Sequence, residues 1–253
     1  MLLIKIFGLF LRENVGIILL LESTRSQKIL CIANTHILFN PKRGDAKLAQ
    51  LMLFLAHLDR VAYRGLQTDQ KKPEYHPTLV CGDFNMDFRS KLYEFMRTSR
   101  LYNFRCLNRN LLSGQLETTG SDLCIENTIL PRELGISDKS QFKHENDKRF
   151  KTKKNQDIFG GDDIGHAFNF ESVYKHHSAD NSSFEVTICL DETKRTVDFI
   201  FFHSETDNAT NESEMSLEAR LELFTMSDLK NVVLPCKYYP SDHFMIAGKF
   251  CIH

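Results

Sequence analysis

The stretch LVCGDFN, residues 79–85, is an apolar run that ends abruptly in polar side chains. Such a short run is typical of a strand that is buried on both faces. Because side chains alternate along a strand, Asp83 and Asn85 are expected on one side and Phe84 on the core side, while Gly82 permits a close approach. A carboxylate and an amide that converge suit a hard cation such as Mg²⁺. The alternative is an Asx turn that only closes the strand.

Similar apolar runs recur on both sides of this stretch and indicate more strands. They lie at residues 15–21, 29–34, 78–81, 197–202 and 244–250. Helices are expected between them, at residues 45–63, 90–99 and 216–224. Apolar residues at i, i+3, i+4 and i+7 spacing make the first helix the clearest, with Asp45 as its N-cap. Strands that alternate with helices and long polar loops predict a layered α/β fold.

Ionisable side chains interrupt three other apolar strands. His36 ends one of them, and Asp198 lies inside the run TVDFIFF. Asp242 and His243 precede the last strand. Burial of such groups is costly without a partner, and an imidazole of His243 that is supported by Asp198 would be held in one tautomer and made more basic. Alone, each residue has a structural explanation, but together they form the inventory for metal-assisted hydrolysis of a phosphodiester.

The composition excludes several classes of protein. With 42% hydrophobic and 26% charged residues, the 253-residue chain is neither disordered, collagen-like nor a coiled coil. A balance of 32 Lys and Arg against 33 Asp and Glu leaves no overall basic surface for nucleic acid. Any binding of nucleic acid or phosphate must therefore depend on a local patch or on metal ions.

The cysteines and the first residues suggest where the protein resides. Seven cysteines, an odd number with no C-x-x-C pair, indicate reduced thiols and a cytoplasmic location, with the nucleus as a second compartment. The opening MLLIKIFGLFL is interrupted by Lys5 and ends at Arg12, too short for a membrane span. We therefore expect no membrane association. A secreted nuclease with disulfides remains an alternative.

A polar, basic insertion loop is expected at residues 136–161. Its central part, KSQFKHENDKRFKTKK, holds seven Lys and Arg against two acidic residues and has almost no apolar residue. Two explanations remain open for this segment. It is either a mobile basic arm that approaches RNA phosphates or a solvated loop.

The order of four motifs resembles that of the endonuclease/exonuclease/phosphatase superfamily. These motifs are NTH at 34–36, GDFN at 82–85, TVDFIF at 196–201 and SDH at 241–243. The text between them, such as THILFNPKRGDAKLAQLMLFLAHLDRVA, is similar to the protein angel branch, which is related to nocturnin and the carbon-catabolite-repressor deadenylases. The resemblance covers residues 14–253, and residues 1–13 are an atypical start. It implies a four-layer α/β sandwich of two mixed β-sheets flanked by helices, with the active site at one open end.

The resemblance also implies a metal site and a substrate class. Asp242, Asp83 and Asn85 would hold Mg²⁺, or Mn²⁺ in its place. Asp83 would also position or deprotonate the attacking water, and Asn85 would bind the metal or the scissile phosphate. Arg43 and Lys47 are candidates for gripping RNA phosphates, with ordinary surface charges as the alternative.

Two histidines complete the catalytic set that the resemblance implies. Asp198 would orient His243, which would serve as the base or stabilise the transition state. His36 would contact the phosphate oxygens as they gain charge. The catalytic residues are therefore expected to be His36, Asp83, Asn85, Asp198 and His243.

The chain departs from the family pattern at its N-terminal side. Members of the family begin with a strand that carries Asn and continue to a strand whose Glu is a principal metal ligand, and this sequence shows neither. Glu13 and Glu22 flank the first expected strand in surroundings that match a later part of the pattern, so neither is assigned this role. We therefore expect an N-terminally incomplete domain, in which metal binding would be weaker.

The expected function is that of a Mg²⁺-dependent phosphodiester hydrolase that acts on RNA 3′ ends. The resemblance leaves two reactions open, a 3′–5′ exoribonuclease of deadenylase type and a 2′,3′-cyclic phosphatase. The alternative is a truncated, catalytically inactive form that binds RNA or a protein.

Overall fold

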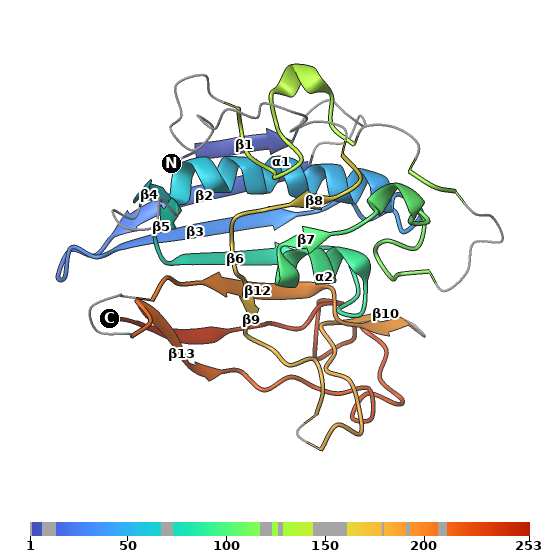
Figure 1. Ribbon diagram of the computed structural model, residues 1–253. Coiled ribbons are helices and arrows are strands. Elements are labelled where there is room, and N and C mark those ends of the chain that lie inside the picture. The colour runs from blue at the N-terminus through green and yellow to red at the C-terminus, as the bar shows by residue number, and fades with distance from the viewer. Residues whose placement is uncertain are drawn as a thin grey trace.

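The computed structural model describes residues 2–6, 14–66, 73–116, 123–125, 129–143, 161–178, 180–190, 193–206 and 212–253. Its largest element is a mixed sheet of six strands in the order β1-β2-β3-β6-β12-β9 (Figure 1). The strands are β1 (Leu2–Ile6), β2 (Asn14–Glu22), β3 (Ile29–His36), β6 (Thr78–Asp83), β12 (Asp198–His203) and β9 (Glu171–Ser172). Strands β3 and β6 are parallel, and the other neighbouring pairs are antiparallel.

Four small sheets, two helices and two short 3₁₀ helices complete the described part. The small sheets pair β4 (Tyr63–Leu66) with β5 (Pro73–Tyr75), β7 (Arg100–Leu101) with β8 (Ile164–Gly165), β10 (Ile188–Leu190) with β11 (Thr193–Arg195), and β13 (Met215–Arg220) with β14 (Gly248–Ile252). The helices are α1 (Gly44–Ala62) and α2 (Lys91–Thr98), and the 3₁₀ helices are η1 (Phe104–Cys106) and η2 (Arg132–Leu134). Among these residues, no helix combines the length and the apolar character that a membrane span needs.

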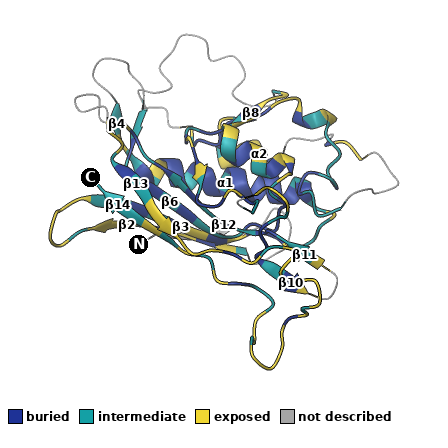
Figure 2. Ribbon diagram, turned by 90° about the horizontal axis from the view of Figure 1, so that it is seen from below, coloured by how far each residue is buried: buried dark blue, intermediate teal, exposed yellow. Residues whose placement is uncertain are grey.

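One face of the six-stranded sheet is covered by the helices. Helices α1 and α2 lie on that side of the sheet (Figures 1 and 2). Val80 and Phe199 of the sheet have no exposed surface and belong to one core cluster with Leu48 of α1 and Phe95 of α2. Because side chains alternate along each strand, the residues between these core positions lie on the opposite face. That opposite face carries the residues of the candidate site.

The opposite face is only partly covered in the described chain. Ile200 and Phe202 of β12 pack with Leu217 of β13 and Phe250 of β14 in a second apolar cluster. A six-stranded mixed sheet, with helices on one face and the antiparallel β13–β14 sheet on the other, agrees with the expected α/β sandwich. The second sheet is small, since the described residues contribute only β13 and β14 to it.

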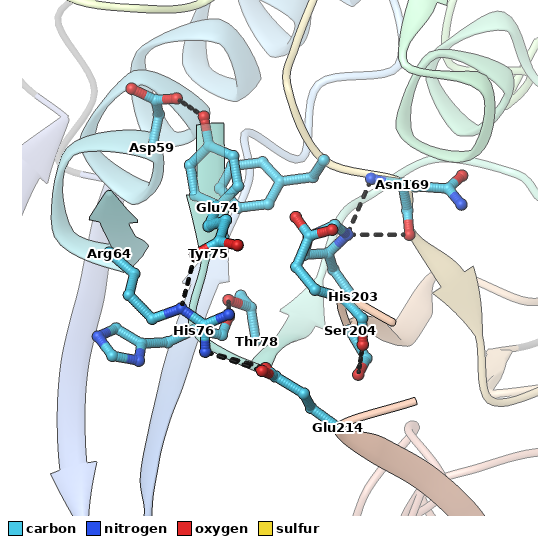
Figure 3. A network of polar contacts seen from close by, with 12 residues as sticks. Asp59, Arg64, Glu74, Tyr75, His76, Thr78, Asn169, His203, Ser204 and Glu214 are labelled. Carbon is cyan, nitrogen blue, oxygen red and sulfur yellow. Dashed lines mark hydrogen bonds and ion pairs between the residues drawn. The ribbon is translucent and has the colours of Figure 1, made fainter. Parts of the chain in front are cut away.

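A buried polar network joins α1 to β5. The hydroxyl of Tyr75 in β5 donates to the carboxylate of Asp59 in α1 (Figure 3). The amide of Gln141 donates to the same carboxylate at 2.7 Å. Gln141 therefore ties the first part of the expected insertion loop to α1. Residues 144–160 lie outside the described residues.

Replacing Tyr75 by Phe should destabilise the fold. Asp59 is 2% exposed, so its carboxylate would lose one donor without gaining water. The loss of a partner by a buried polar group costs about 1–3 kcal/mol. We expect the free energy of unfolding in urea to fall by about that amount. Tyr102→Phe is the matched control, because Tyr102 is 57% exposed, and an equal loss in the control would contradict the prediction.

The structure corrects three details of the predicted elements. Residues 215–220 form strand β13 and not a helix, and the last strand begins at Gly248 and not at Phe244. Helix α1 begins at Gly44, and its N-cap residue Arg43 makes no side-chain cap bond, so Asp45 is not the N-cap. Ser90, the N-cap residue of α2, accepts a hydrogen bond from the main-chain N–H of Tyr93. None of the seven cysteines, all of them described, forms a disulfide.

Candidate active site

Three neighbouring strands place three ionisable side chains in one row. In the register of the sheet, Asp83 at the end of β6 pairs with His36 at the end of β3 and with Asp198 at the start of β12. Directly paired residues on neighbouring strands share a face, so all three side chains lie on the face away from the helices. His36 Nε2 lies 3.4 Å from Asp83 Oδ2, with the His36 side chain 67% exposed. The row is therefore open to solvent on the His36 side.

The turn after β6 fixes Asp83 and Asn85 relative to each other. Asp83 Oδ1 accepts a hydrogen bond from the main-chain N–H of Asn85 at 2.8 Å, so the Asx turn that was the alternative explanation is present. Asn85 has a φ of 47° and is buried, and its amide donates to Ile37 O at 2.9 Å and to Asp83 Oδ2 at 3.2 Å. Phe84 points to the core, where its ring contacts Phe199 and Phe201 edge to face.

His243 joins the row from the C-terminal part of the chain. Its Nδ1 lies 2.8 Å from Asp198 Oδ2, and a bridge between Ile188 and His243 holds the main chain beside β10. The hydrogen bond from Asp198 raises the pKa of His243, and the charges of Asp83 and Asp242 add to this effect. The contact that orients His243 in the predicted set is thus present in the structure. The other ring nitrogen, Nε2, is the one left for substrate, metal or proton.

Burial and a neighbouring negative charge both raise the pKa of Asp83. Removal from water and the facing carboxylate of Asp198 raise the pKa of Asp83, against the opposing effects of the Asn85 N–H group, His36 and His243. Two carboxylates that face each other on a half-buried surface repel one another unless a cation or a proton lies between them. The site therefore favours an added positive charge.

The donor atoms of the site suit a divalent metal ion. Ligand atoms of Asp83, Asp198 and His243 all lie within 4.8 Å of one another, the only such group of His, Cys, Asp and Glu side chains in the described chain. Two carboxylate oxygens and an imidazole nitrogen are common ligands of divalent cations. Enzymes of this fold generally depend on such an ion. The residues present therefore fit a metal, and Asp83 and Asp198 are the first candidates to hold it.

Asp242 does not belong to this group of ligand atoms, although the sequence predicted it as a metal ligand. The main-chain oxygen of Asp242 accepts from the N–H of Cys189 at 2.8 Å, which holds the SDH motif beside β10. The pairing of β12 with β6 brings Asp198 beside Asp83, which makes Asp198 a further candidate metal ligand. The assignment of Asp242 stays a prediction. Asp198 was expected only to orient His243, and the geometry allows it to do both.

The two residues predicted to grip RNA lie in different surroundings. Arg43 is held by Asp45 through two hydrogen bonds of 2.9 and 3.0 Å. Lys47 has no exposed surface, so it is neither a surface charge nor a residue that RNA reaches. Its Nζ donates to Asn85 O at 2.6 Å and to the side chain of Gln115. Lys47 therefore supports the turn that carries Asn85.

Sequence reasoning did not identify two further residues that position the site. Asn14 donates from its side-chain amide to His36 O at 2.8 Å and accepts from Gln50 at 3.0 Å. Gln50 also accepts from the main-chain N–H of Leu38 at 2.9 Å, so these two amides fix the chain that leaves β3. The sequence contains one sign of this role. Lys47 and Gln50 are polar residues three positions apart on the otherwise apolar face of α1, so both needed polar partners.

Lys47 should make stability depend on pH. Burial lowers the pKa of Lys47 from 10.5 to about 7, so between these values the unfolded chain binds a proton that the folded chain does not. The contribution of Lys47 to the free energy of unfolding therefore rises with pH above 7, by at most about 1.4 kcal/mol per pH unit. Urea unfolding at pH 7.0, 7.5, 8.0 and 8.5 should show this slope for the wild type relative to Lys47→Met. Parallel curves for the two proteins would contradict the assignment.

Known proteins resemble this chain in sequence and in structure. No family model matches it. Protein angel homolog 2 of Danio rerio is 34% identical over 257 residues, which cover 96% of this chain and 44% of that protein. The crystal structure of ANGEL2, a 2′,3′-cyclic phosphatase, matches with a TM-score of 0.79 and 33% sequence identity. The matched part covers 98% of this chain and 65% of the ANGEL2 chain. The ANGEL2 complex with adenosine-2′,3′-vanadate has a TM-score of 0.76 and 34% identity, with 94% and 61% covered.

The fold and the carboxylate–imidazole row place the protein in the endonuclease/exonuclease/phosphatase superfamily. The sequence and structural matches agree on one group within it. The chain belongs to the angel branch of that superfamily. It spans about half the length of the curated relatives that it matches, 44% of the Danio rerio protein and 47% of the human one.

Proposed function

We propose that this chain carries the hydrolytic site of a metal-dependent 2′,3′-cyclic phosphatase that acts on RNA 3′ ends. The observation that carries the proposal is the convergence of Asp83, Asp198 and His243, whose ligand atoms lie within 4.8 Å of one another. The similarity to ANGEL2, which was crystallised with adenosine-2′,3′-vanadate, favours a cyclic phosphate as the substrate over a polyadenylate tail. Mg²⁺ is the proposed ion because the site offers carboxylate oxygens, with Mn²⁺ as the substitute.

The residues of the row have separate parts in the proposed reaction. A water oxygen forms a bond to phosphorus, one ribose P–O bond breaks, and the ribose oxygen takes up a proton. A divalent ion, when bound, stabilises the charge on the phosphate oxygens. Asp83 accepts a hydrogen bond from the water, and its raised pKa makes it a stronger base than an ordinary carboxylate. His36, exposed and beside Asp83, is placed to contact a phosphate oxygen.

His243 serves as the group that holds or moves a proton on the other side of the row. Its Nδ1 is occupied by Asp198, which leaves Nε2 for the exchange. A carboxylate behind an imidazole fixes the tautomer and increases the basicity of the far nitrogen. The raised pKa of His243 fits this part, because a proton taken from water or given to the ribose oxygen must be held near neutral pH.

A second candidate function is a catalytically inactive form that binds RNA or a protein. The ligand set of the described residues favours it, since the group of Asp83, Asp198 and His243 includes no Glu, the residue that the family pattern uses as a principal metal ligand. The two candidates differ in their response to metal. An inactive form would show neither turnover nor a higher Tm when Mg²⁺ is added.

The test uses two 5′-labelled RNA oligonucleotides, one with a 2′,3′-cyclic phosphate end and one with a poly(A) tail that ends in a 3′-OH. With Mg²⁺ present, we expect the chain to convert the cyclic end and to leave the poly(A) tail intact. Asp198→Asn should slow the reaction by about 100-fold or more, because it removes both a ligand and the support of His243. Glu22→Gln, at the exposed end of β2, is the matched control and should keep the wild-type rate.

Each possible result of this assay separates the candidates. Shortening of the poly(A) tail without conversion of the cyclic end would identify a deadenylase. Equal rates for the wild type and Asp198→Asn would show that the row is not the active site. Absence of turnover together with an unchanged Tm in Mg²⁺ would establish the inactive form.

A further inference from the structure

The GDFN turn leads into an exposed arginine that is held in a fixed orientation. Arg89 Nε donates to Asp87 Oδ1 at 2.9 Å, and Arg89 Nη2 donates to Asp87 Oδ2 at 3.1 Å. The Asp87 side chain is only 3% exposed, whereas the Arg89 side chain is 62% exposed. A bidentate pair with a buried carboxylate fixes the plane of a guanidinium group. The plane of the Arg89 side chain is therefore set before any ligand binds.

Half-buried aromatic rings lie against this guanidinium group. Its carbon atom Cζ is 5.3 Å from the centre of the Phe88 ring and 5.1 Å from the centre of the Phe184 ring. The centres of these two rings are 5.4 Å apart, and the ring of His177 contacts both of them. We call this surface, formed by Phe88, Arg89, His177 and Phe184, the aromatic platform.

The aromatic platform rests on the core. His177 and Phe184 pair in an antiparallel bridge, and the N–H of the preceding residue, His176, donates to Glu185 Oε2 at 2.7 Å. His176 is 2% exposed, and its ring stacks on the ring of Phe88 with centres 5.2 Å apart. On another side, the His176 ring contacts the ring of Phe199 in β12, also at 5.2 Å. The aromatic platform is therefore a supported surface and not a set of loose side chains.

Two connections place the aromatic platform beside the carboxylate–imidazole row. Phe88 lies three positions after Asn85 in the chain that leaves β6. Phe184 lies three positions before Thr187, whose Oγ1 accepts a hydrogen bond from the N–H of Asp198 at 3.1 Å. A nucleic-acid strand whose end occupies the row therefore reaches the aromatic platform within its first nucleotides.

We propose that the aromatic platform stacks a nucleobase immediately 5′ of the RNA end that occupies the row. Aromatic rings and guanidinium planes stack on nucleobases with little regard to their identity. The charge of Arg89 is paired with Asp87, so the flat surface favours a base over a phosphate or an acidic peptide. With a net charge of -1, the protein must hold RNA through such a local surface. The inference rests on the proposed function, which puts an RNA 3′ end at the row, and adds a preference for oligonucleotides over mononucleotides.

The test titrates the full chain, in Mg²⁺, with a short RNA oligonucleotide that ends in a 3′-phosphate on a 2′-deoxyribose. This end offers a phosphate to the row but cannot form the cyclic ester, so the readout is binding without turnover. The next nucleotide carries 2-aminopurine, a fluorescent base whose emission falls when it stacks. We expect quenching on binding. Arg89→Lys should raise the Kd by about fivefold or more, because lysine keeps the charge beside Asp87 and loses the plane.

Two further variants and a mononucleotide separate stacking from other effects. Phe184→Leu keeps an apolar side chain and removes the ring, so it should also weaken binding and quenching. Arg60→Lys is the matched control, because Arg60 is exposed and its Cζ lies 4.9 Å from the centre of the Phe142 ring, but in the last turn of α1. Its Kd should equal that of the wild type. The mononucleotide 2′-deoxyadenosine 3′-phosphate reaches only the row, so it should compete equally well in all four proteins.

The outcomes distinguish this inference from the proposed function. Equal Kd values and equal quenching in the wild type, Arg89→Lys and Phe184→Leu would overturn the inference, and so would a wild type that does not bind the oligonucleotide. Weaker binding of the mononucleotide by the same factor would also overturn it, because the variants would then disturb the row. Quenching by a chain that does not convert the cyclic phosphate end would support the aromatic platform and contradict the proposed hydrolysis.

Discussion

Asp83→Asn is expected to stabilise the metal-free protein and to abolish its response to a divalent ion. Burial and the charge of Asp198 raise the pKa of Asp83 above its ordinary value of 3.8. The unfolded chain therefore loses this proton at lower pH than the folded chain does, and the stability that the protonated group contributes is lost as the pH rises through the folded pKa. Asparagine lacks the charge, and it can still accept the hydrogen bond from the N–H of Asn85.

Thermal unfolding in EDTA and in Mg²⁺ at neutral pH tests this prediction. In EDTA, we expect the Tm of Asp83→Asn to exceed that of the wild type, by about 2–4 °C for each kcal/mol of repulsion removed. In Mg²⁺, the wild type should gain stability by mass action, and the variant should not. If the chain has the proposed activity, turnover of the cyclic phosphate should fall by about 100-fold or more in the variant, as for the loss of a metal ligand or a general base. A Tm that Mg²⁺ raises equally in both proteins would place the ion elsewhere.

Gly82→Ala should cause a large loss of stability, although it adds only one methyl group. Gly82 has a φ of 144°, and a Cβ at this position would lie 1.8 Å from Thr35 O on the neighbouring strand. The close approach of β3 and β6 beside the site therefore requires glycine. We expect the free energy of unfolding to fall by more than about 4 kcal/mol, a loss that few single substitutions reach.

Gly65→Ala supplies the matched control for this prediction. A Cβ at Gly65 would meet no atom within 4 Å, and its φ is not in the left-handed region. The added methyl should leave stability unchanged or raise it by about 0.4–1 kcal/mol, because alanine restricts the unfolded chain. Urea unfolding of both variants measures the difference. A loss at Gly82 no larger than at Gly65 would show that β3 and β6 separate easily.

The elements that the sequence predicted well are those with a regular apolar pattern. The apolar runs at 15–21 and 29–34 became β2 and β3, and the stripe at i, i+3, i+4 and i+7 became α1. The segment 216–224 failed because Leu, Glu, Ala and Arg are good helix formers, and only the pairing with β14 makes it a strand. That pairing joins segments that are far apart in the chain, which no local pattern contains.

The candidate site shows the same division between local and distant information. Strand ends that turn polar predicted His36, Asp83 and Asp198, and the register of the sheet places them in one row. The burial of Lys47 could not be read from its charge, because it depends on Asn85 and Gln115 closing over the start of α1. Which of Asp198 and Asp242 lies with the ligand atoms depends on strand register, which a single sequence does not fix.

Because His36, Asp83 and Asp198 lie on three adjacent strands, they also constrain the strand register during folding. A slip of one residue between β6 and either neighbour would turn an acidic or imidazole group into the helix-covered interior, where its desolvation is prohibitive. Misaligned pairings are thus penalised by the very groups that would bind phosphate. During folding, affinity for a divalent ion should therefore appear together with the pairing of β3, β6 and β12. Binding of the ion could then be used to follow the formation of the central sheet.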